Sequence, residues 1–254
     1  MSSTNSSIEW TERTWNPTTG CARVSAGCDN CYALTLVNTR QVKNPRSPRF
    51  GHPFEEVMLH ENRLDQPLAW KTGYRIFVDS MSDLFHRDIP DAFIDRVFDV
   101  MERATQHTYQ LLTKRSERMK RYVNKRYPYA PCPSHIWLGV SVEDNRVAWR
   151  SHDLRATNAM VRWISAEPLI GSLNAVSLTD FDWVVAGGES GKHPRPMDLD
   201  WARDLRDRCT SAGVAFFLKQ LGGAHDKRGG DKAVLDGRRW TEYPVVNPAI
   251  IRTP

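Results

Sequence analysis

Residues 75–83, RIFVDSMSD, join a short strand pattern to a polar stretch, and this combination recurs along the chain. Isoleucine, phenylalanine and valine at residues 76–78 favour a buried strand. Downstream, similar β-branched or aromatic runs alternate with amphipathic helical patterns. Strands that recur about one βα unit apart predict a parallel sheet with right-handed crossovers.

The alternation predicts an α/β protein. Strands are expected at residues 8–11, 75–78, 109–112, 136–140, 161–164, 183–186 and 214–218. Helices are expected at residues 32–40, 54–64, 90–104, 115–125, 144–155 and 198–209. This number of strands favours a complete or partial parallel (β/α) TIM-like barrel. An open dinucleotide-binding sheet is less favoured, because no strand is followed by G-x-G-x-x-G.

The C-terminal part of the sequence departs from this alternation. Glycine pairs at residues 222–223 and 229–230 interrupt it, and residues 232–240 contain an Asp-Gly pair between two short runs. An Asp-Gly pair favours a tight β-hairpin turn. We therefore expect residues 1–221 to form the barrel with its N-terminal cysteine loop. Residues 222–254 are expected to form a small hairpin appendage and tail packed on the same domain.

Polar residues follow most of the expected strands. In a parallel barrel, binding and catalytic residues gather where strands end and βα loops begin. The candidates are Asp79, Ser80, Ser82, Lys114, Glu143, Glu167, Glu189 and Lys219. One such residue is often only a helix cap. Their recurrence at successive strand ends predicts a binding site, and Gly187-Gly188 would let a ligand approach the backbone closely.

A cysteine loop lies near the N-terminus, where Cys21, Cys28 and Cys31 form the pattern C-x₆-C-x₂-C. Thiolates on such a loop are soft ligands that suit an iron–sulfur cluster or zinc. Three cysteines leave one iron of a four-iron cluster open to an outside ligand, whereas structural zinc normally takes a fourth Cys or His. The pattern favours a 4Fe–4S cluster, and zinc stays open as the alternative.

Composition narrows the cellular setting. The chain has five cysteines, three of them clustered, and its N-terminal residues form no secretory signal. This usage indicates a reducing, cytoplasmic compartment rather than a disulfide framework. No apolar run is long enough for a membrane span. A net charge of +5 and a pI near 9.0 mildly favour polyanionic partners.

Two basic segments have alternative interpretations. Residues 114–126 carry seven Lys and Arg side chains, with tyrosines at 122, 127 and 129. Either the cations bind the backbone of a nucleic acid and the tyrosines stack on its bases, or the run forms a solvated helix face. The Pro-, Arg- and His-rich connector at residues 44–53 is either a phosphate contact or a solvated loop.

The chain resembles the phage-associated three-Cys-motif protein family of unknown function, and through it a divergent radical S-adenosylmethionine (SAM) enzyme. The stretches that carry the resemblance are residues 15–33, 78–85, 112–115, 137–143, 165–168 and 187–191. They are distributed over most of the chain up to Gln220.

This resemblance implies specific roles. Cys21, Cys28 and Cys31 would hold a 4Fe–4S cluster whose open iron binds SAM, and reductive cleavage of SAM would give a 5′-deoxyadenosyl radical. The residues near the SAM amino group would be Asp79, Ser80 and Ser82, and those near ribose or substrate Glu143, Glu167 and Glu189. Phage origin would place the protein in the host cytoplasm, with a partner protein from the same phage neighbourhood and nucleic acid as a candidate substrate.

Two other functions remain open from the sequence. The first is a zinc-stabilised phage nucleic-acid-binding protein without catalysis, in which His52 joins the cysteines and the basic run at residues 114–126 contacts the nucleic acid. The second is a metal-free barrel hydrolase or transferase, whose working residues would be Asp79, Glu167, Glu189 and Lys219.

Overall fold

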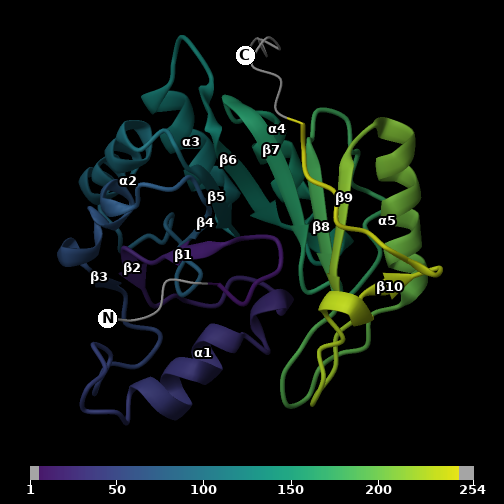
Figure 1. Cartoon of the computed structure of the whole chain (residues 1–254), viewed down its shortest axis with the longest axis horizontal. Helices are drawn as coiled ribbons and strands as arrows, with labels where there is room; N and C mark the ends of the chain where they lie inside the picture. The colour runs from purple at the N-terminus through teal and green to yellow at the C-terminus, as the bar shows by residue number, and fades with distance from the viewer. Residues whose placement is uncertain (1–5, 246–254) are drawn as a thin grey trace. The chain divides into compact units, whose positions relative to one another are not determined.

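The computed structural model describes residues 6–245, and the chain divides into two compact units, residues 1–112 and 113–254. The main strands follow the order β1-β4-β5 in the first unit and β6-β7-β8-β9 in the second (Figure 1). Within each unit these main strands pair in parallel. The predicted α/β class and partial parallel barrel are therefore confirmed.

The first unit contains three parallel strands. They are β1 (Arg13–Trp15), β4 (Arg75–Val78) and β5 (Thr108–Thr113), and the last begins in this unit and ends at its boundary. Trp15 pairs with Val78, and Val78 with Leu111. The helix α2 (Asp91–Arg103) connects β4 to β5. Its buried residues recur at helical spacing, so that one apolar stripe enters the core: Phe93, Ile94, Val97, Phe98, Val100 and Met101.

Short elements fill the long segment between β1 and β4. Strand β2 (Thr18–Thr19) pairs antiparallel with β3 (Met58–Leu59). Between them lie a 3₁₀ turn (Ala26–Cys28), the helix α1 (Tyr32–Leu36) and its π-helical continuation (Val37–Gln41). Two further 3₁₀ turns, Glu61–Arg63 and Gln66–Ala69, precede β4.

Two expected elements of this unit are wrong. The strand expected at residues 8–11 is a turn, and the strand begins at Arg13. The helix expected at residues 54–64 is replaced by β3 and a 3₁₀ turn. Tertiary hydrogen bonds explain the second error, because the Phe54 carbonyl accepts from Cys21 N–H (2.9 Å) and Met58 pairs with Thr19.

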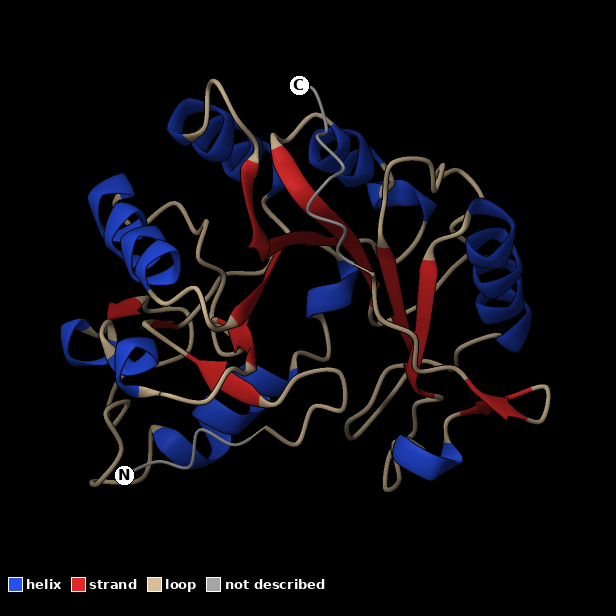
Figure 2. Ribbon diagram, turned by 45° about the horizontal axis from the view of Figure 1, so that its top comes forward, coloured by secondary structure: helices blue, strands red, loops and turns tan. Residues whose placement is uncertain are grey.

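The second unit carries the remaining parallel strands. They are β6 (Cys132–Ser141), β7 (Ala159–Ala166), β8 (Trp183–Gly187) and β9 (Ala215–Gln220). Their helices are α3 (Ser116–Arg126), α4 (Trp149–Arg155) and α5 (Leu199–Ala212), shown beside the strands in Figure 2. Short 3₁₀ turns lie at Asn145–Val147 and Gly230–Lys232.

The C-terminal hairpin is present as predicted. Strands β10 (Val234–Leu235) and β11 (Arg238–Arg239) pair across Asp236 and Gly237, whose φ angles of 53° and 76° suit a tight hairpin turn. Arg206 of α5 contacts the Asp236 carboxylate at 2.5 Å, which ties the hairpin to the second unit. The boundary expected at residue 221 stays a prediction, and most of the expected tail lies outside the described residues.

None of the helices between residues 6 and 245 has the length and apolar character needed to cross a membrane.

Candidate functional site

The cysteine loop begins at a closely packed glycine. Gly20 has a φ of 96°, and a Cβ atom there would lie 2.2 Å from the carbonyl oxygen of Glu56. Gly20 N–H donates to the Met81 carbonyl (3.0 Å), and Cys21 N–H donates to the Phe54 carbonyl (2.9 Å). The backbone that enters the loop is therefore fixed to two neighbouring segments.

All three cysteines of the loop are half-buried thiols that form no disulfide. Cys28 N–H donates to the Ser25 carbonyl (3.0 Å) and Cys31 N–H to the Cys28 carbonyl (3.3 Å), so one tight turn leads into Cys28 and a second connects it to Cys31. Cys21 and Cys31 both pack against one apolar cluster, formed by Ala33, Val37 and Phe54. The first and last cysteines of the pattern therefore lie on the same small core.

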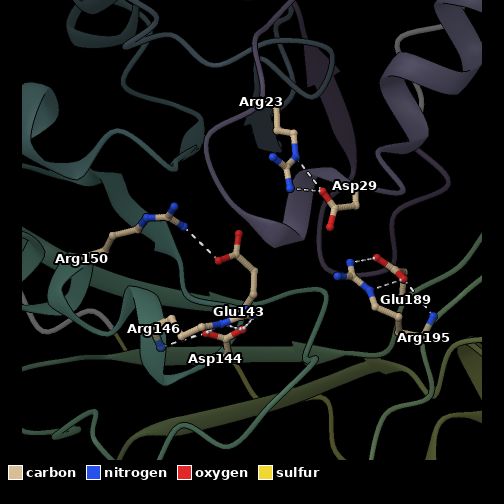
Figure 3. Close-up of polar contacts among 8 residues, drawn as sticks. All are labelled: Arg23, Asp29, Glu143, Asp144, Arg146, Arg150, Glu189 and Arg195. Carbon is tan, nitrogen blue, oxygen red and sulfur yellow. Dashed lines mark hydrogen bonds and ion pairs between the residues drawn. The ribbon is translucent and has the colours of Figure 1, made fainter.

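An ion pair folds back the long gap between Cys21 and Cys28. Arg23 contacts the Asp29 carboxylate through both Nε and Nη2 at 2.6 Å (Figure 3). Arg23 lies two residues after Cys21, and Asp29 directly follows Cys28. The pair therefore shortens a gap that the sequence spacing alone leaves wide.

Within residues 6–245, no three His, Cys, Asp or Glu side chains form an arrangement that would hold one metal ion. His52, the fourth ligand expected for zinc, contacts the Glu56 carboxylate instead (2.8 Å).

The loop after β4 is bound to the cysteine loop by the residues that the sequence singled out. Asp79 accepts from Thr18 N–H (3.0 Å) and from the Thr18 hydroxyl (2.9 Å). The Ser80 hydroxyl donates to Asn16 Oδ1 (3.1 Å), and the Ser82 hydroxyl to the Gly20 carbonyl (2.8 Å). These contacts place the carboxyl end of β4 against the cysteine loop.

Asp79 is buried in an unusual backbone conformation. Its φ of 59° lies in the left-handed region, which few residues other than glycine adopt. The pKa of its carboxyl is raised to about 8, chiefly by burial and also by the nearby Asp83, whereas the hydrogen bonds from Thr18 and the charge of Arg63 oppose the shift. Asp79 therefore carries a proton over much of the neutral range.

Two buried basic residues that contact Thr19, just before the cysteine loop, were not predicted from the sequence. Arg49 is fully buried, and its Nη1 donates to the carbonyls of Glu56 (2.7 Å) and Thr19 (3.3 Å), while Nη2 donates to Pro53. His60 contacts the Thr19 hydroxyl (2.9 Å), and its pKa is lowered to about 4, chiefly by burial. No sequence pattern distinguishes Arg49 from the exposed arginines around it.

In the second unit, Glu143 forms a buried charge cluster. Its carboxylate contacts Arg150 Nη1 (3.0 Å) and Lys114 Nζ (3.5 Å), as Figure 3 shows for the arginine. The same Arg150 nitrogen donates to the Ser141 carbonyl at the end of β6 (2.9 Å). Arg150 was not predicted, because it lies within an amphipathic helical pattern and ion-pairs with a residue outside its own helix.

Glu167 and Lys219 form a more accessible ion pair at the ends of β7 and β9. Their charged atoms lie 2.8 Å apart, and the two side chains are 14% and 19% exposed. A Cβ atom on Gly187 of β8 would lie 2.9 Å from Glu167 Oε1. Gly187 therefore provides the space in which the Glu167 carboxylate reaches Lys219.

Glu189, after β8, is buried and bound by Arg195. The Arg195 backbone N–H and Nε each donate to Oε2 at 2.9 Å, and Nη2 contacts Oε1 (Figure 3). A Cβ atom on Gly188 would lie 2.3 Å from the Leu221 carbonyl oxygen. Gly188 is therefore required for close packing of the backbone after β8 against the backbone after β9.

The basic run expected at residues 114–126 and the tyrosines near it include both buried or ion-paired side chains and exposed ones. Within the basic run, Tyr122 is buried, Lys120 is paired with Asp153 (2.5 Å), and Tyr129 is 96% exposed. The acidic residues that follow strands of the second unit, Glu143, Glu167 and Glu189, each contact a Lys or Arg side chain of that unit.

Comparison with known proteins identifies a family. No curated protein matches the sequence. Two solved structures are similar: spore photoproduct lyase in complex with a dinucleoside spore photoproduct, at 12% identity and a TM-score of 0.49, and a mutant of spore photoproduct lyase, at 10% and 0.47. The matches cover 84% and 87% of this chain, but only 65% and 59% of those chains. A family model described as "Protein of unknown function (DUF5131)" matches residues 5–244, and the chain belongs to that family.

Proposed function

We propose that this protein is a radical SAM enzyme in which Cys21, Cys28 and Cys31 bind a 4Fe–4S cluster. Reductive cleavage of bound SAM would start radical chemistry on a substrate for which nucleic acid is the candidate class. The protein would act in the cytoplasm, which is the host cytoplasm if a phage encodes it.

The position of the cysteine loop is the observation that carries this proposal. The loop follows β1, and Gly20 at its start is hydrogen-bonded to the loop after β4. Both loops therefore lie at carboxyl ends of neighbouring parallel strands, where barrel enzymes place their chemistry. Thiols at such a position are a suitable donor set for a redox cofactor.

The cluster, when bound, would supply the electron for SAM cleavage and an open iron for the amino and carboxylate groups of SAM. We place Asp79, Ser80 and Ser82 near that amino group. The Ser80 and Ser82 hydroxyls donate within the protein, so their oxygen lone pairs can accept from an ammonium. Asp79 holds Thr18 and thereby fixes the loop that carries both serines.

We assign Glu143, Glu167 and Glu189 to the neighbourhood of ribose or substrate. Glu167 is the best placed of these to accept from a hydroxyl, because its side chain and that of Lys219 are both partly exposed. Glu143 and Glu189 are more deeply buried and would orient the loops that carry them.

Metal content after anaerobic iron–sulfur reconstitution tests the cofactor assignment. Wild-type protein should retain about four irons and matching sulfide per chain, and Cys28→Ser should lose the cluster. Cys209→Ala is the matched control, because Cys209 is buried in α5 and burial raises the pKa of its thiol to about 12. Iron retention by Cys28→Ser equal to that of wild type would exclude the cluster.

The two other functions give different results in the same experiment. A zinc-stabilised nucleic-acid-binding protein would retain about one zinc per chain and would not bind SAM. A metal-free hydrolase or transferase would retain no metal, and Cys28→Ser would leave its folding and ligand binding intact.

A further inference from the structure

The segment from Arg40 to Phe50 carries exposed cations with no acidic residue among them. Between Asn30 and Phe54 the sequence contains no Asp or Glu. Arg40, Lys43 and Arg46 are all exposed. Phe50, in the same segment, is 52% exposed. The segment therefore presents three exposed cations and an exposed phenyl ring, a combination that suits a polyanion with bases that can stack.

Backbone hydrogen bonds give this segment a defined shape. Gly51 N–H donates to the Val42 carbonyl (3.1 Å), which closes residues 42–51 into a compact loop. Within it, Ser47 N–H donates to the Asn44 carbonyl (2.9 Å) and Phe50 N–H to the Ser47 carbonyl (3.0 Å). Asn44 Oδ1 also accepts from Arg46 N–H (3.0 Å). Lys43, Arg46 and Phe50 are therefore presented from one folded loop.

The loop is fixed beside the cysteine loop. The buried guanidinium of Arg49 donates to the carbonyls of Thr19 and Glu56, and Thr19 lies two residues before Cys21. Val42, at the root of the loop, packs on the same apolar cluster as Cys21 and Cys31. A polymer that binds the loop is thereby held near the apolar cluster on which Cys21 and Cys31 pack.

From these observations we infer that residues 40–50 form a docking surface for single-stranded nucleic acid. Arg40, Lys43 and Arg46 bind backbone phosphates, and a base stacks on Phe50. Cations spaced along a segment with an exposed aromatic ring match the way single strands are bound without sequence preference. This inference rests on the proposed function in one respect only, which is that the bound strand is the substrate.

Fluorescence anisotropy with labelled oligothymidylate tests the docking surface on the full, anaerobically purified chain. Arg40→Gln/Lys43→Gln/Arg46→Gln should weaken binding about tenfold, and the slope of log Kd against log salt should fall by about 2, because each phosphate contact on a single strand contributes about 0.7. The matched control is Lys71→Gln/Arg103→Gln/Lys227→Gln, which removes the same charge from exposed positions outside the loop. Equal binding by the two triple variants would overturn the inference.

The aromatic contact and the choice of partner have their own tests. Phe50→Leu should weaken binding about fivefold or more, while Phe50→Tyr keeps a ring and should bind like wild type. Wild type should also prefer the single strand to a duplex of equal length. Binding to phosphatidylserine vesicles without binding to oligothymidylate would overturn the inference in favour of a membrane surface. None of these measurements requires SAM cleavage, so they can fail or succeed independently of the proposed function.

Discussion

Asp79 and Glu143 are both buried carboxylates that follow parallel strands, but their surroundings differ. Asp79 is hydrogen-bonded by the neutral Thr18, and its pKa is raised by burial. Glu143 contacts the cations of Arg150 and Lys114. Single substitutions at the two positions should therefore have distinct effects on stability.

Asp79 should make the free energy of unfolding fall as pH rises. Its folded pKa of about 8 lies above the ordinary value of 3.8, so the folded state binds the proton more tightly. The favourable contribution is complete below about pH 4 and is lost between about pH 4 and 8, by up to about 1.4 kcal/mol per pH unit. Relative to wild type, Asp79→Asn should therefore become progressively more stable over this interval in urea unfolding.

The free energy of unfolding of wild type has to be compared with that of the variant at each pH, because His60 changes stability with pH in the opposite direction. Its folded pKa of about 4 lies below 6.5, so its contribution to stability increases with pH. Asp95→Asn, at an exposed position on α2, is the control and should leave the pH profile unchanged. A constant difference between wild type and Asp79→Asn would contradict the assignment of a raised pKa.

Glu143→Gln should lower the free energy of unfolding by about 3 kcal/mol, because it leaves the buried Arg150 without its carboxylate. Urea unfolding gives this value. Glu143→Gln/Arg150→Met should cost less than the sum of its single substitutions, since no buried guanidinium is left without its carboxylate. The exposed Glu117→Gln on α3 is the control. Strict additivity of the two single substitutions would show that the pair is not coupled.

At the scale of elements, the cysteine loop depends on contacts that bring distant positions together. Gly20 allows close approach to Glu56, and the Arg23–Asp29 pair folds the segment between the first two cysteines. These contacts between protein groups hold the loop in shape. Preformed loops reduce the ordering cost of binding a cofactor.

Arg23→Ala should weaken cluster retention without abolishing it. An exposed ion pair contributes about 1 kcal/mol at most, which corresponds to no more than about a fivefold loss of affinity. Iron retention during titration with a chelator measures the effect. Arg87→Ala is the control, because Arg87 is exposed and pairs with the adjacent Asp88. Complete loss of iron in Arg23→Ala would mean that the arginine has a role beyond loop closure.

The local sequence pattern was sufficient to predict elements whose regular spacing of apolar residues determines which side is buried. The strand at Arg75–Val78 was predicted with its observed bounds, and the helix α2 lies within the predicted range. The segment at residues 54–64 was not predictable in this way, because its backbone pairs with Thr19 and Cys21, which lie far away in sequence. Long-range pairing of this kind overrides a local acidic and apolar pattern.

The residues of the candidate site were also predictable only in part. Strand-end position identified Asp79, Ser80 and Ser82, which contact residues 16–20 at the start of the cysteine loop. It did not identify Arg49 or Arg150, whose burial depends on tertiary neighbours.

At the scale of the whole molecule, the two units carry different groups at their strand ends. The first has thiols, hydroxyls and the buried carboxyl of Asp79. The second has acidic residues that are paired with Lys or Arg. A redox cofactor suits the thiol-bearing unit, and hydroxyl-rich or charged ligands suit the acidic one. The proposed radical SAM function would draw on the thiols of the first unit for its cofactor.

Formation of 5′-deoxyadenosine tests this function most directly. Iron-loaded protein would be mixed anaerobically with SAM and dithionite, and the product would be measured by mass spectrometry. We expect 5′-deoxyadenosine with wild type and Cys209→Ala, and none above background with Cys28→Ser. Iron-loaded wild type that forms no more 5′-deoxyadenosine than Cys28→Ser would contradict the proposed function.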